Sequence, residues 1–182
     1  ADWNNDGLVG YMNNFGTTYL SGEKLQQITG TEISFFNNLV IDNNSSQPIE
    51  LAGTISIAGQ CRFNNGIVDN MDNVGEVYFE EGATQVNAQN RSHVNGKVLK
   101  IGNQNFNYPI GNGNTYRSAG ISAPELSNDS FEGTYFFENV SLNYPTNNKT
   151  QTIEVVNNQE YWKIEPKSGA SDVLITLTWN ER

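Results

Sequence analysis

The chain has 182 residues, a formal net charge of −10 and a sequence pI of about 4.4. This acidic balance disfavours nucleic acid and anionic lipid as partners, and it suits a secreted protein or one that binds cations. The only cysteine, Cys61, excludes an internal disulfide, and one cysteine with one histidine cannot build a four-coordinate zinc site.

Asparagine, glycine, threonine and serine are plentiful, which is typical of many short strands joined by tight turns. We find no convincing amphipathic helix. No segment reaches the length and apolarity of a membrane span, so we expect no membrane insertion. No signal peptide is visible, and we therefore expect a mature chain or a fragment of a longer one.

Residues 1–30 contain three strand-like pieces, at residues 8–12, 17–20 and 25–29, separated by glycines. Residues 2–7 also match the start of a calcium loop, D-x-N-x-D-G, with Asp2, Asn4 and Asp6 as its ligands. The match fails at Asn13, where such a loop needs a bidentate Glu. A solenoid corner that begins with a stacked Trp3 explains the stretch better, and calcium remains the weaker interpretation and the only cofactor suggested.

Residues 33–70 form the stretch around which the chain is organised. Apolar runs of strand length alternate there with Asn, Gly and Ser, and they are rich in β-branched and aromatic residues. The runs are residues 33–36, 39–41, 49–51, 55–57 and 66–68. A large apolar residue followed by Asn-Asn recurs as Trp3-Asn4-Asn5, Met12-Asn13-Asn14, Phe36-Asn37-Asn38 and Phe63-Asn64-Asn65.

The last two of these copies lie about 27 residues apart, which matches one turn of a β-solenoid. Each turn is too thin to bury its own apolar face, so we expect Phe36 and Phe63 to stack on successive turns. Asn suits the corners, and equivalent Asn side chains would form a hydrogen-bonded ladder. Cys61 is then a buried, unreactive strand residue. The alternative is a β-sandwich whose hairpin turns are rich in Asn.

Residues 71–100 continue the pattern, with strands at 76–80 and 83–86 and a hairpin-like turn at 94–98. Glu80 and Glu81 are adjacent, and because neighbours in a strand point to opposite faces, they cannot share a proton or a substrate. Residues 106–113 form a strand that ends in a glycine-rich turn without a phosphate-binding pattern.

From residue 121 the predicted strands are longer and alternate more regularly, at residues 133–137, 151–156, 160–165 and 173–179. The sequence therefore predicts an all-β protein: a parallel β-solenoid over residues 1–100, followed by a small antiparallel β-sandwich over residues 101–182. We expect the sandwich to cap the open end of the solenoid, with Phe106, Tyr108 and Ile110 at the contact. The alternative is two independent units joined by a flexible turn at Gly102-Asn103.

The order of several motifs resembles the β-solenoid surface proteins that Bacteroidetes export by type IX secretion. The matching residues are Trp3-Asn4-Asn5-Asp6-Gly7, residues 22–30 with Gln27 and Ile28, residues 36–41 (FNNLVI), Asn65-Gly66-Ile67, residues 94–98 (VNGKV), residues 106–113 (FNYPIGNG), Tyr116-Arg117, residues 160–164 and Leu177-Thr178-Trp179. The resemblance covers most of the chain. It implies a secreted or surface-attached protein, often an adhesin, and no particular ligand. The family's C-terminal sorting domain does not follow Trp179, so we expect an excerpt or a processed piece.

Candidate catalytic residues are few. His93 would be the only base for a histidine triad, and its neighbour Ser92 diverges from it in a strand. Polysaccharide lyases and hydrolases occur among β-helices, and Asp69, Asp72, Glu76 and Arg62 are the candidates for such a groove. A solenoid of about 100 residues has few turns, which is short for the long groove of these enzymes.

The leading hypothesis is a non-enzymatic structural or adhesive segment of a large cell-surface protein. Its partners would be other segments of that protein or extracellular glycans. A carbohydrate-binding module is the first alternative, in which exposed aromatic residues such as Tyr11, Tyr19 or Tyr144 would bind sugar rings. A polysaccharide-active enzyme is the second alternative.

Overall fold

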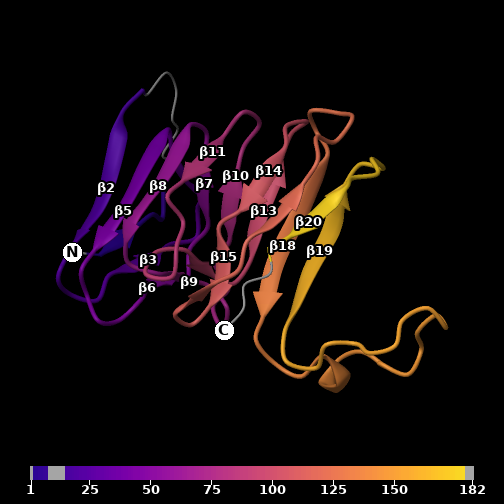
Figure 1. The fold of residues 1–182 in the computed structure, drawn as a ribbon. Helices are drawn as coiled ribbons and strands as arrows, with labels where there is room; N and C mark the ends of the chain where they lie inside the picture. The colour runs from indigo at the N-terminus through magenta and orange to yellow at the C-terminus, as the bar shows by residue number, and fades with distance from the viewer. Residues whose placement is uncertain (1, 8–14, 179–182) are drawn as a thin grey trace.

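A computed structural model describes residues 2–7 and 15–178 of the chain (Figure 1). The described residues are almost entirely strands and turns, with one short 3-10 helix, η1 (Val140–Leu142), and no α-helix. The prediction of an all-β fold is confirmed. The predicted strand at residues 8–12, the Met12-Asn13-Asn14 motif, Tyr11 and Trp179 lie outside the described residues.

Three parallel ladders build the solenoid. Sheet A has the order β1-β3-β6-β9-β12-β15-β16, sheet C the order β11-β8-β5-β2, and sheet B the order β19-β18-β13-β10-β7-β4. The strands of sheet A are β1 (Trp3–Asn4), β3 (Gln27–Thr29), β6 (Ile49–Leu51), β9 (Val68–Asp69), β12 (Val94–Asn95), β15 (Ile110–Asn112) and β16 (Thr115–Tyr116). Those of sheet C are β2 (Thr17–Gly22), β5 (Asn38–Asn43), β8 (Gln60–Asn65) and β11 (Thr84–Val86). Those of sheet B are β4 (Ser34–Phe36), β7 (Ile55–Ile57), β10 (Val77–Phe79), β13 (Val98–Ile101), β18 (Ser130–Phe136) and β19 (Tyr161–Ser168).

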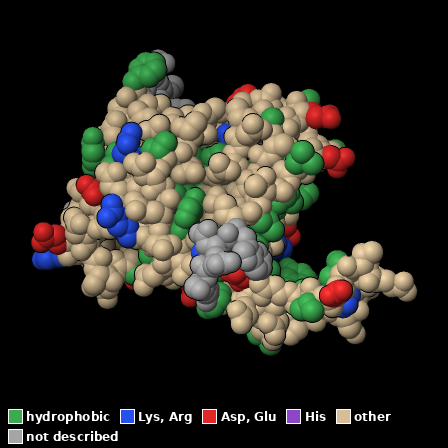
Figure 2. All heavy atoms as spheres, in the orientation of Figure 1, with side chains coloured by type: hydrophobic (Ala, Val, Ile, Leu, Met, Phe, Trp, Pro, Cys, Tyr) green, Lys and Arg blue, Asp and Glu red, His purple; other side chains and the backbone are tan. Residues whose placement is uncertain are grey.

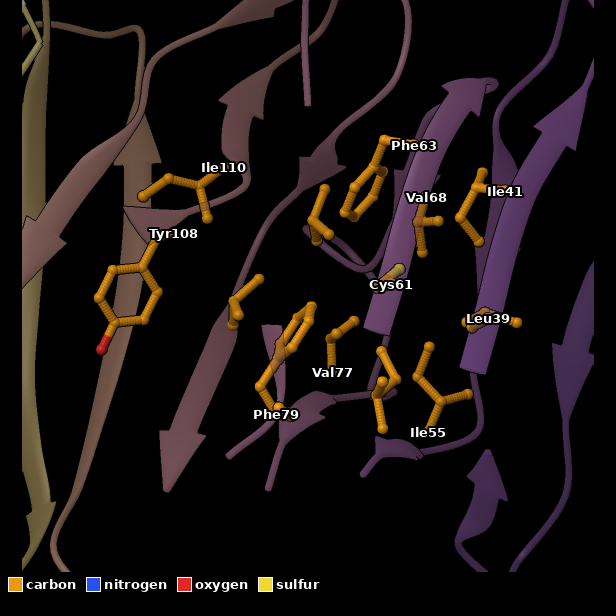
Figure 3. Close-up of a cluster of buried hydrophobic side chains, with 14 of the residues drawn as sticks. Leu39, Ile41, Ile55, Cys61, Phe63, Val68, Val77, Phe79, Tyr108 and Ile110 are labelled. Carbon is orange, nitrogen blue, oxygen red and sulfur yellow. The ribbon is translucent and has the colours of Figure 1, made fainter. Parts of the chain in front are cut away.

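Each turn passes through one strand of sheet C, one of sheet A and one of sheet B, and about four turns stack side by side (Figure 1). Ile55 is aligned with Val77, and Val77 with Val98, so the repeat in sheet B is 21 or 22 residues. The inward-facing residues of successive turns meet in rows because side chains alternate between the two faces of a strand. These rows form one apolar interior, in which side chains from several turns point toward one another (Figure 3).

The expected stacking of Phe36 on Phe63 is wrong. Both side chains are buried, but Phe36 lies in sheet B beside Ile57, whereas Phe63 lies in sheet C beside Ile41. The distance between the two Asn-Asn motifs therefore does not measure one turn. Because the motifs mark different corners, Asn37 and Asn38 do not form a ladder with Asn64 and Asn65.

Trp3 does take part in packing at the first turn. Its ring lies 5.4 Å from that of Phe36, centroid to centroid, and its indole N–H donates to Ser34 Oγ at 2.9 Å. The predicted corner led by a stacked Trp is consistent with this contact. Asn4 is exposed and Asn5 is buried, so only Asn5 occupies the interior of the corner.

Three buried asparagines, Asn5, Asn43 and Asn70, each face a glycine of the following turn. The glycines are Gly30, Gly66 and Gly96, and all three have positive φ. A Cβ atom added at Gly96 would lie 1.9 Å from Asn70 Oδ1, and one at Gly30 would lie 2.1 Å from the Asn5 carbonyl oxygen. Glycine is thus required because it adopts this backbone conformation and leaves room for the Asn beneath it.

Each of these asparagines satisfies backbone groups inside its corner. Asn70 donates through Nδ2 to the carbonyl oxygens of Gly75 (3.1 Å) and Lys97 (3.0 Å), and its Oδ1 accepts from Lys97 N (2.9 Å). Asn43 donates to the backbone carbonyl oxygen of Lys24 and to the side-chain Oε1 of Gln26, and its Oδ1 accepts from Ser45 N. At the corners of a solenoid, some backbone N–H and C=O groups have no partner in a neighbouring strand. A buried amide side chain provides the missing hydrogen bonds.

The C-terminal part continues the solenoid sheets. The last parallel pairing joins β12 to β15, with Val94 beside Ile110, so parallel stacking extends past the predicted boundary at residue 100. In sheet B the direction then reverses, because β18 runs antiparallel to β13, and β19 antiparallel to β18. A cap sheet of β14 (Phe106–Tyr108), β17 (Ala119–Ile121) and β20 (Ile175–Leu177) is antiparallel throughout.

The cap sheet and the extended sheet B face each other as two layers. Tyr108 of β14 packs its ring over Gly133 of β18, and its hydroxyl donates to the carbonyl oxygen of Phe131 at 2.9 Å. Phe106 contacts the ring of Phe79 in the solenoid at 5.0 Å. The two layers form a small β-sandwich that shares one core with the solenoid. Between β18 and β19, the chain makes a long excursion away from this body (Figure 1).

We expect the chain to unfold as one unit, because backbone pairing and a common core join its two parts. Gly102 is buried and its N–H donates to the Asp129 carbonyl oxygen at 2.9 Å, so the junction should resist limited proteolysis. Urea unfolding followed by tryptophan fluorescence and by far-UV circular dichroism should give coincident transitions. Rapid cleavage near Gly102 into two separately folded pieces would contradict this expectation.

Candidate binding pocket

A polar pocket of about 300 Å³ lies where loops of successive turns meet beside sheet A. It receives residues from the connection between β5 and β6, from the β8–β9 corner, from β9 and β12, and from the tight turn between β15 and β16. Its lining consists of Ser45, Ser46, Gln47, Pro48, Asn65, Gly66, Ile67, Asp69, Arg91, Asn95, Gly113 and Asn114. Most of the lining residues are polar or glycine, with one carboxylate and one guanidinium, and Pro48 and Ile67 contribute apolar surface.

The carboxylate of the pocket is held in place by neighbouring turns. Asp69 Oδ1 accepts hydrogen bonds from Met71 N and from Asn95 Nδ2, both at 3.0 Å. Asn95 in turn accepts from Gly113 N at 3.2 Å, so its side chain connects the β9 strand end to the β15–β16 turn. Because both amide ends of Asn95 are engaged, the side chain has a fixed orientation in the wall.

The guanidinium enters from the loop between β11 and β12. Arg91 Nε donates to the carbonyl oxygen of Asn64 at 3.1 Å. Among the described residues Arg91 has no ion pair, and Asp69 is the one other charged residue of the pocket lining. Arg91 is exposed, and this bond restrains its Nε while the terminal N–H groups are left as donors.

This arrangement suits a ligand with many hydroxyl groups. Side-chain amides offer both a donor and an acceptor, and a carboxylate oxygen accepts from a hydroxyl. Ligand pockets combine such placed polar groups with a concave shape, and this pocket has a volume at the small end of the usual range. Figure 2 shows a face of the molecule on which charged and hydrophobic side chains are scattered among the backbone and other side chains.

The predicted catalytic residues are not brought together. Asp69 lies in the pocket, but Asp72 is exposed in the following bend, and Glu76 accepts a hydrogen bond from the Tyr78 hydroxyl. Burial and the Glu76 carboxylate raise the pKa of Tyr78 to about 12. Arg62 lies on sheet C, where it donates to Gln60 Oε1 at 3.1 Å. Asp69 therefore has no second acidic residue beside it in the pocket lining.

His93 is buried beneath the β15–β16 turn. Its Nδ1 lies 3.0 Å from the carbonyl oxygen of Gln89, and its ring packs 6.2 Å from that of Tyr116. The ring is so close to Gly111 that a Cβ atom there would lie 2.6 Å from Nε2. Burial lowers the pKa of His93, so the neutral imidazole is the form that this packing accommodates.

We expect stability to fall as the pH is lowered below the ordinary histidine pKa of about 6.5. In this window the unfolded chain binds a proton at His93 that the folded chain does not, so protonation favours unfolding. His93 is the only histidine, which makes the experiment selective. Urea unfolding at pH 7.5, 6.5 and 5.5 should show this loss in the wild type and a weaker dependence in His93→Asn. Parallel curves for the two proteins would contradict the assignment.

Of the residues in the calcium interpretation, Asn4 and Asp6 lie in contact, but their polar atoms and those of Asp2 bond to other protein groups. Asp2 Oδ1 accepts from Gln27 N at 3.1 Å, whereas Asp6 accepts from the amide of Asn4 (2.8 Å) and from Thr31 N (3.2 Å). These bonds lower the pKa of Asp6 and use the oxygens that a cation would need. In the parts of the chain that the structure describes, no group of three or more His, Cys, Asp or Glu side chains is placed to hold a metal ion.

The aromatic and cysteine candidates lie away from the pocket. Tyr19 is exposed on β2, and Tyr144 is exposed in the excursion between β18 and β19. Neither lines the pocket, which contains no aromatic side chain. Cys61 is fully buried in sheet C and burial raises the pKa of its thiol, as the sequence-based interpretation of an unreactive strand residue requires.

Sequence reasoning missed Arg91, Asn95 and the loop at residues 45–48. With the correct period, the alignment of Asp69 with Asn95 in sheet A would have indicated that their side chains lie next to each other.

No helix among the described residues is long and apolar enough to cross a membrane. Comparisons of the chain with protein-family models, with curated proteins and with solved structures find no match.

Proposed function

We propose that this chain is a non-enzymatic adhesive segment of a cell-surface protein, and that it binds carbohydrate in the polar pocket. The observation that carries the proposal is the pocket itself, in which anchored amides, one carboxylate and one guanidinium line a concave surface of about 300 Å³. Ligands with many hydroxyl groups match this mixture of donors and acceptors. The extracellular location rests on the motif resemblance and on the acidic composition.

Support for binding comes from how rigidly the wall is built. Asp69, Asn95 and Gly113 belong to three successive turns and are linked by hydrogen bonds. A wall that is already ordered loses little conformational entropy when a ligand binds, which favours affinity. The continuous core beneath the pocket gives the same advantage, since the stacked turns cannot shift independently.

Binding without catalysis is supported by the distribution of acidic groups. Glycoside cleavage ordinarily uses two carboxyl groups on opposite sides of the scissile bond. Asp69 is the only carboxylate in the lining, and one of its oxygens already accepts two hydrogen bonds. The pocket therefore offers contacts for a sugar and no acid–base pair.

A glycan array is the first test, and we expect retention of a defined set of oligosaccharides. Asn95→Ala removes the amide that links Asp69 to Gly113, so it should weaken the binding of a retained glycan about tenfold, as expected for the loss of a fixed polar contact. The matched control is Asn128→Ala, an exposed position outside the lining, which should bind as the wild type does. The folding of both variants is checked by circular dichroism.

Three outcomes would contradict the proposal. If the array retains no glycan, a purely structural role as a stalk or filament segment replaces it. If acidic polysaccharides incubated with the protein release reducing ends, and Asp69→Asn abolishes the release, the enzyme alternative replaces it. Binding that survives Asn95→Ala unchanged would place the glycan site elsewhere on the chain.

A further inference from the structure

We propose that the polar pocket selects sugars that carry a carboxylate, such as uronic acids, and that Arg91 makes the selecting contact. This inference rests on the proposed function, because it names the class of carbohydrate that the same pocket takes. It follows from a comparison of the two charged side chains in the lining, Arg91 and Asp69. They differ in how many of their polar atoms already form hydrogen bonds with the protein.

The carboxylate of Asp69 is largely committed to the protein. Its Oδ1 accepts from Met71 N and from Asn95 Nδ2, which leaves Oδ2 as an acceptor for a ligand hydroxyl. The Arg91 guanidinium has only its Nε engaged, by the Asn64 carbonyl oxygen at 3.1 Å, and Nη1 and Nη2 have no bond to a described residue. The positive group is therefore the one that lacks a counterion.

The anchoring contact also fixes what Arg91 can bind. With Nε held by a backbone carbonyl, the two terminal nitrogens present a planar pair of donors, and a carboxylate is the ligand group that matches this pair bidentately. A neutral sugar would use the same donors less well, since a hydroxyl accepts one hydrogen bond without charge.

The neighbouring lining suits the remainder of a sugar ring. Asn65 is oriented by its bond to Asn44 Oδ1 at 2.8 Å, and Ser45 and Gln47 are joined by a hydrogen bond of 3.0 Å in the loop opposite. These groups stand around the pocket that Arg91 enters, so ring hydroxyls would meet amides and hydroxyls while the carboxylate meets the guanidinium. The overall charge of −10 opposes an acidic ligand at long range, but physiological salt screens charges beyond about 8 Å.

The experiment compares matched sugars by NMR titration of the ¹⁵N-labelled chain. The probes are methyl galacturonide with methyl galactoside, and methyl glucuronide with methyl glucoside, because each pair differs only by a carboxylate in place of a hydroxymethyl group. We expect at least one acidic member to bind about tenfold more tightly than its neutral partner. Arg91→Gln should remove this preference, and Arg91→Lys should restore only part of it. The control Arg62→Gln, on sheet C and outside the lining, should leave the preference unchanged.

The outcomes separate the two proposals. Equal affinity for acidic and neutral partners, or a preference that survives Arg91→Gln, would overturn the selection of acidic sugars while glycan binding stands. Failure of all four sugars and of longer oligosaccharides to shift any resonance of the pocket would overturn both. The affinity of the acidic sugar should also fall with added sodium chloride, whereas that of the neutral sugar should not.

Discussion

Replacing Phe63 with Ala should lower the free energy of unfolding by about 3–5 kcal/mol, the range observed for large aromatic residues removed from protein cores. Phe63 is 1% exposed and lies beside Ile41 in sheet C, with its ring directed into the interior (Figure 3). A void of about 10 Å³ lies among Phe63 and its neighbours, which is about the volume of a single water-sized probe, so the surroundings have little spare volume to redistribute.

The loss is large because a solenoid turn cannot collapse around the cavity. Each turn is held at a fixed spacing by the ladders above and below it, so the space left by the ring remains. Equilibrium urea unfolding of Phe63→Ala measures the effect. Phe15→Ala serves as the matched control, because Phe15 is 88% exposed and its removal should cost less than about 0.5 kcal/mol. A cost below about 1 kcal/mol for Phe63→Ala would mean that the packing described for sheet C is incorrect.

Replacing Asn70 with Ala should cost about 2–4 kcal/mol, because it leaves buried backbone groups without partners. The groups are the carbonyl oxygens of Gly75 and Lys97 and the N–H of Lys97, and these all bond to the Asn70 side chain. Water cannot replace the side chain without opening the corner, since Asn70 is 1% exposed. Asn128→Ala, at an exposed position, is the control and should leave stability unchanged.

The glycine above Asn70 allows the corner to be tested as a pair. Gly96→Ala should destabilise the fold even with Asn70 present, because its Cβ would overlap Asn70 Oδ1 and because φ at Gly96 is +136°. In the double variant Asn70→Ala, Gly96→Ala, the overlap with Asn70 Oδ1 disappears, although the close approach of the Cβ atom to Met71 N at 2.9 Å stays. The two changes should therefore cost less together than the sum of their separate costs. Strict additivity of the two free energies would contradict the proposed contact.

Much of the fold could be predicted from local pattern. The apolar runs around Leu39, Ile55 and Ile57 have the length and composition of strands, and all three side chains are buried in the solenoid. Short β-branched runs separated by Asn and Gly leave few options other than closely stacked strands. Local pattern does not specify which run lies beside which, and this is where the prediction for Phe36 and Phe63 was wrong.

The error in pairing Phe36 with Phe63 arose because the number of residues in a turn depends on its loops. Sheet B repeats every 21 or 22 residues, but the loops of sheet A vary, since Val68 pairs with Val94 on one side and with Ile49 on the other. Loops tolerate such variation because they run over the surface, so a longer or shorter loop changes the packing of the core very little. A repeated dipeptide in the sequence therefore need not occur at a repeated place in the structure.

Lys100 shows a further limit of pattern reasoning. It occupies the inward row of sheet B next to Phe79, where alternation alone would place an apolar residue. Its ammonium donates to the Glu80 carbonyl oxygen at 2.6 Å and lies 5.5 Å from the centre of the Phe106 ring. Burial lowers the pKa of Lys100 to about 8. Lys100 is accommodated in part by its contact with Phe106 of β14. The alternation of residues within one strand does not reveal this contact between strands.

The binding pocket could not be predicted for a related reason. Asp69 was a candidate as an acid, but Arg91, Asn95 and Asn65 acquire their roles only through the stacking of loops from different turns. None of these residues belongs to a motif that fixes its partners by spacing. The reactive-looking residues of the sequence, His93 and Cys61, are instead buried as parts of the packing.

The stacked ladders also determine how the molecule would respond to mechanical tension. In a solenoid the hydrogen bonds between neighbouring parallel strands join one turn to the next, so a pull along the stack would open them one after another. The ladder between β6 and β9 aligns only two residues on each side, whereas that between β2 and β5 aligns six. Stretching would thus begin to part neighbouring turns on the sheet A side, beside the pocket, and the interlocked side chains of the core would then carry the remaining load.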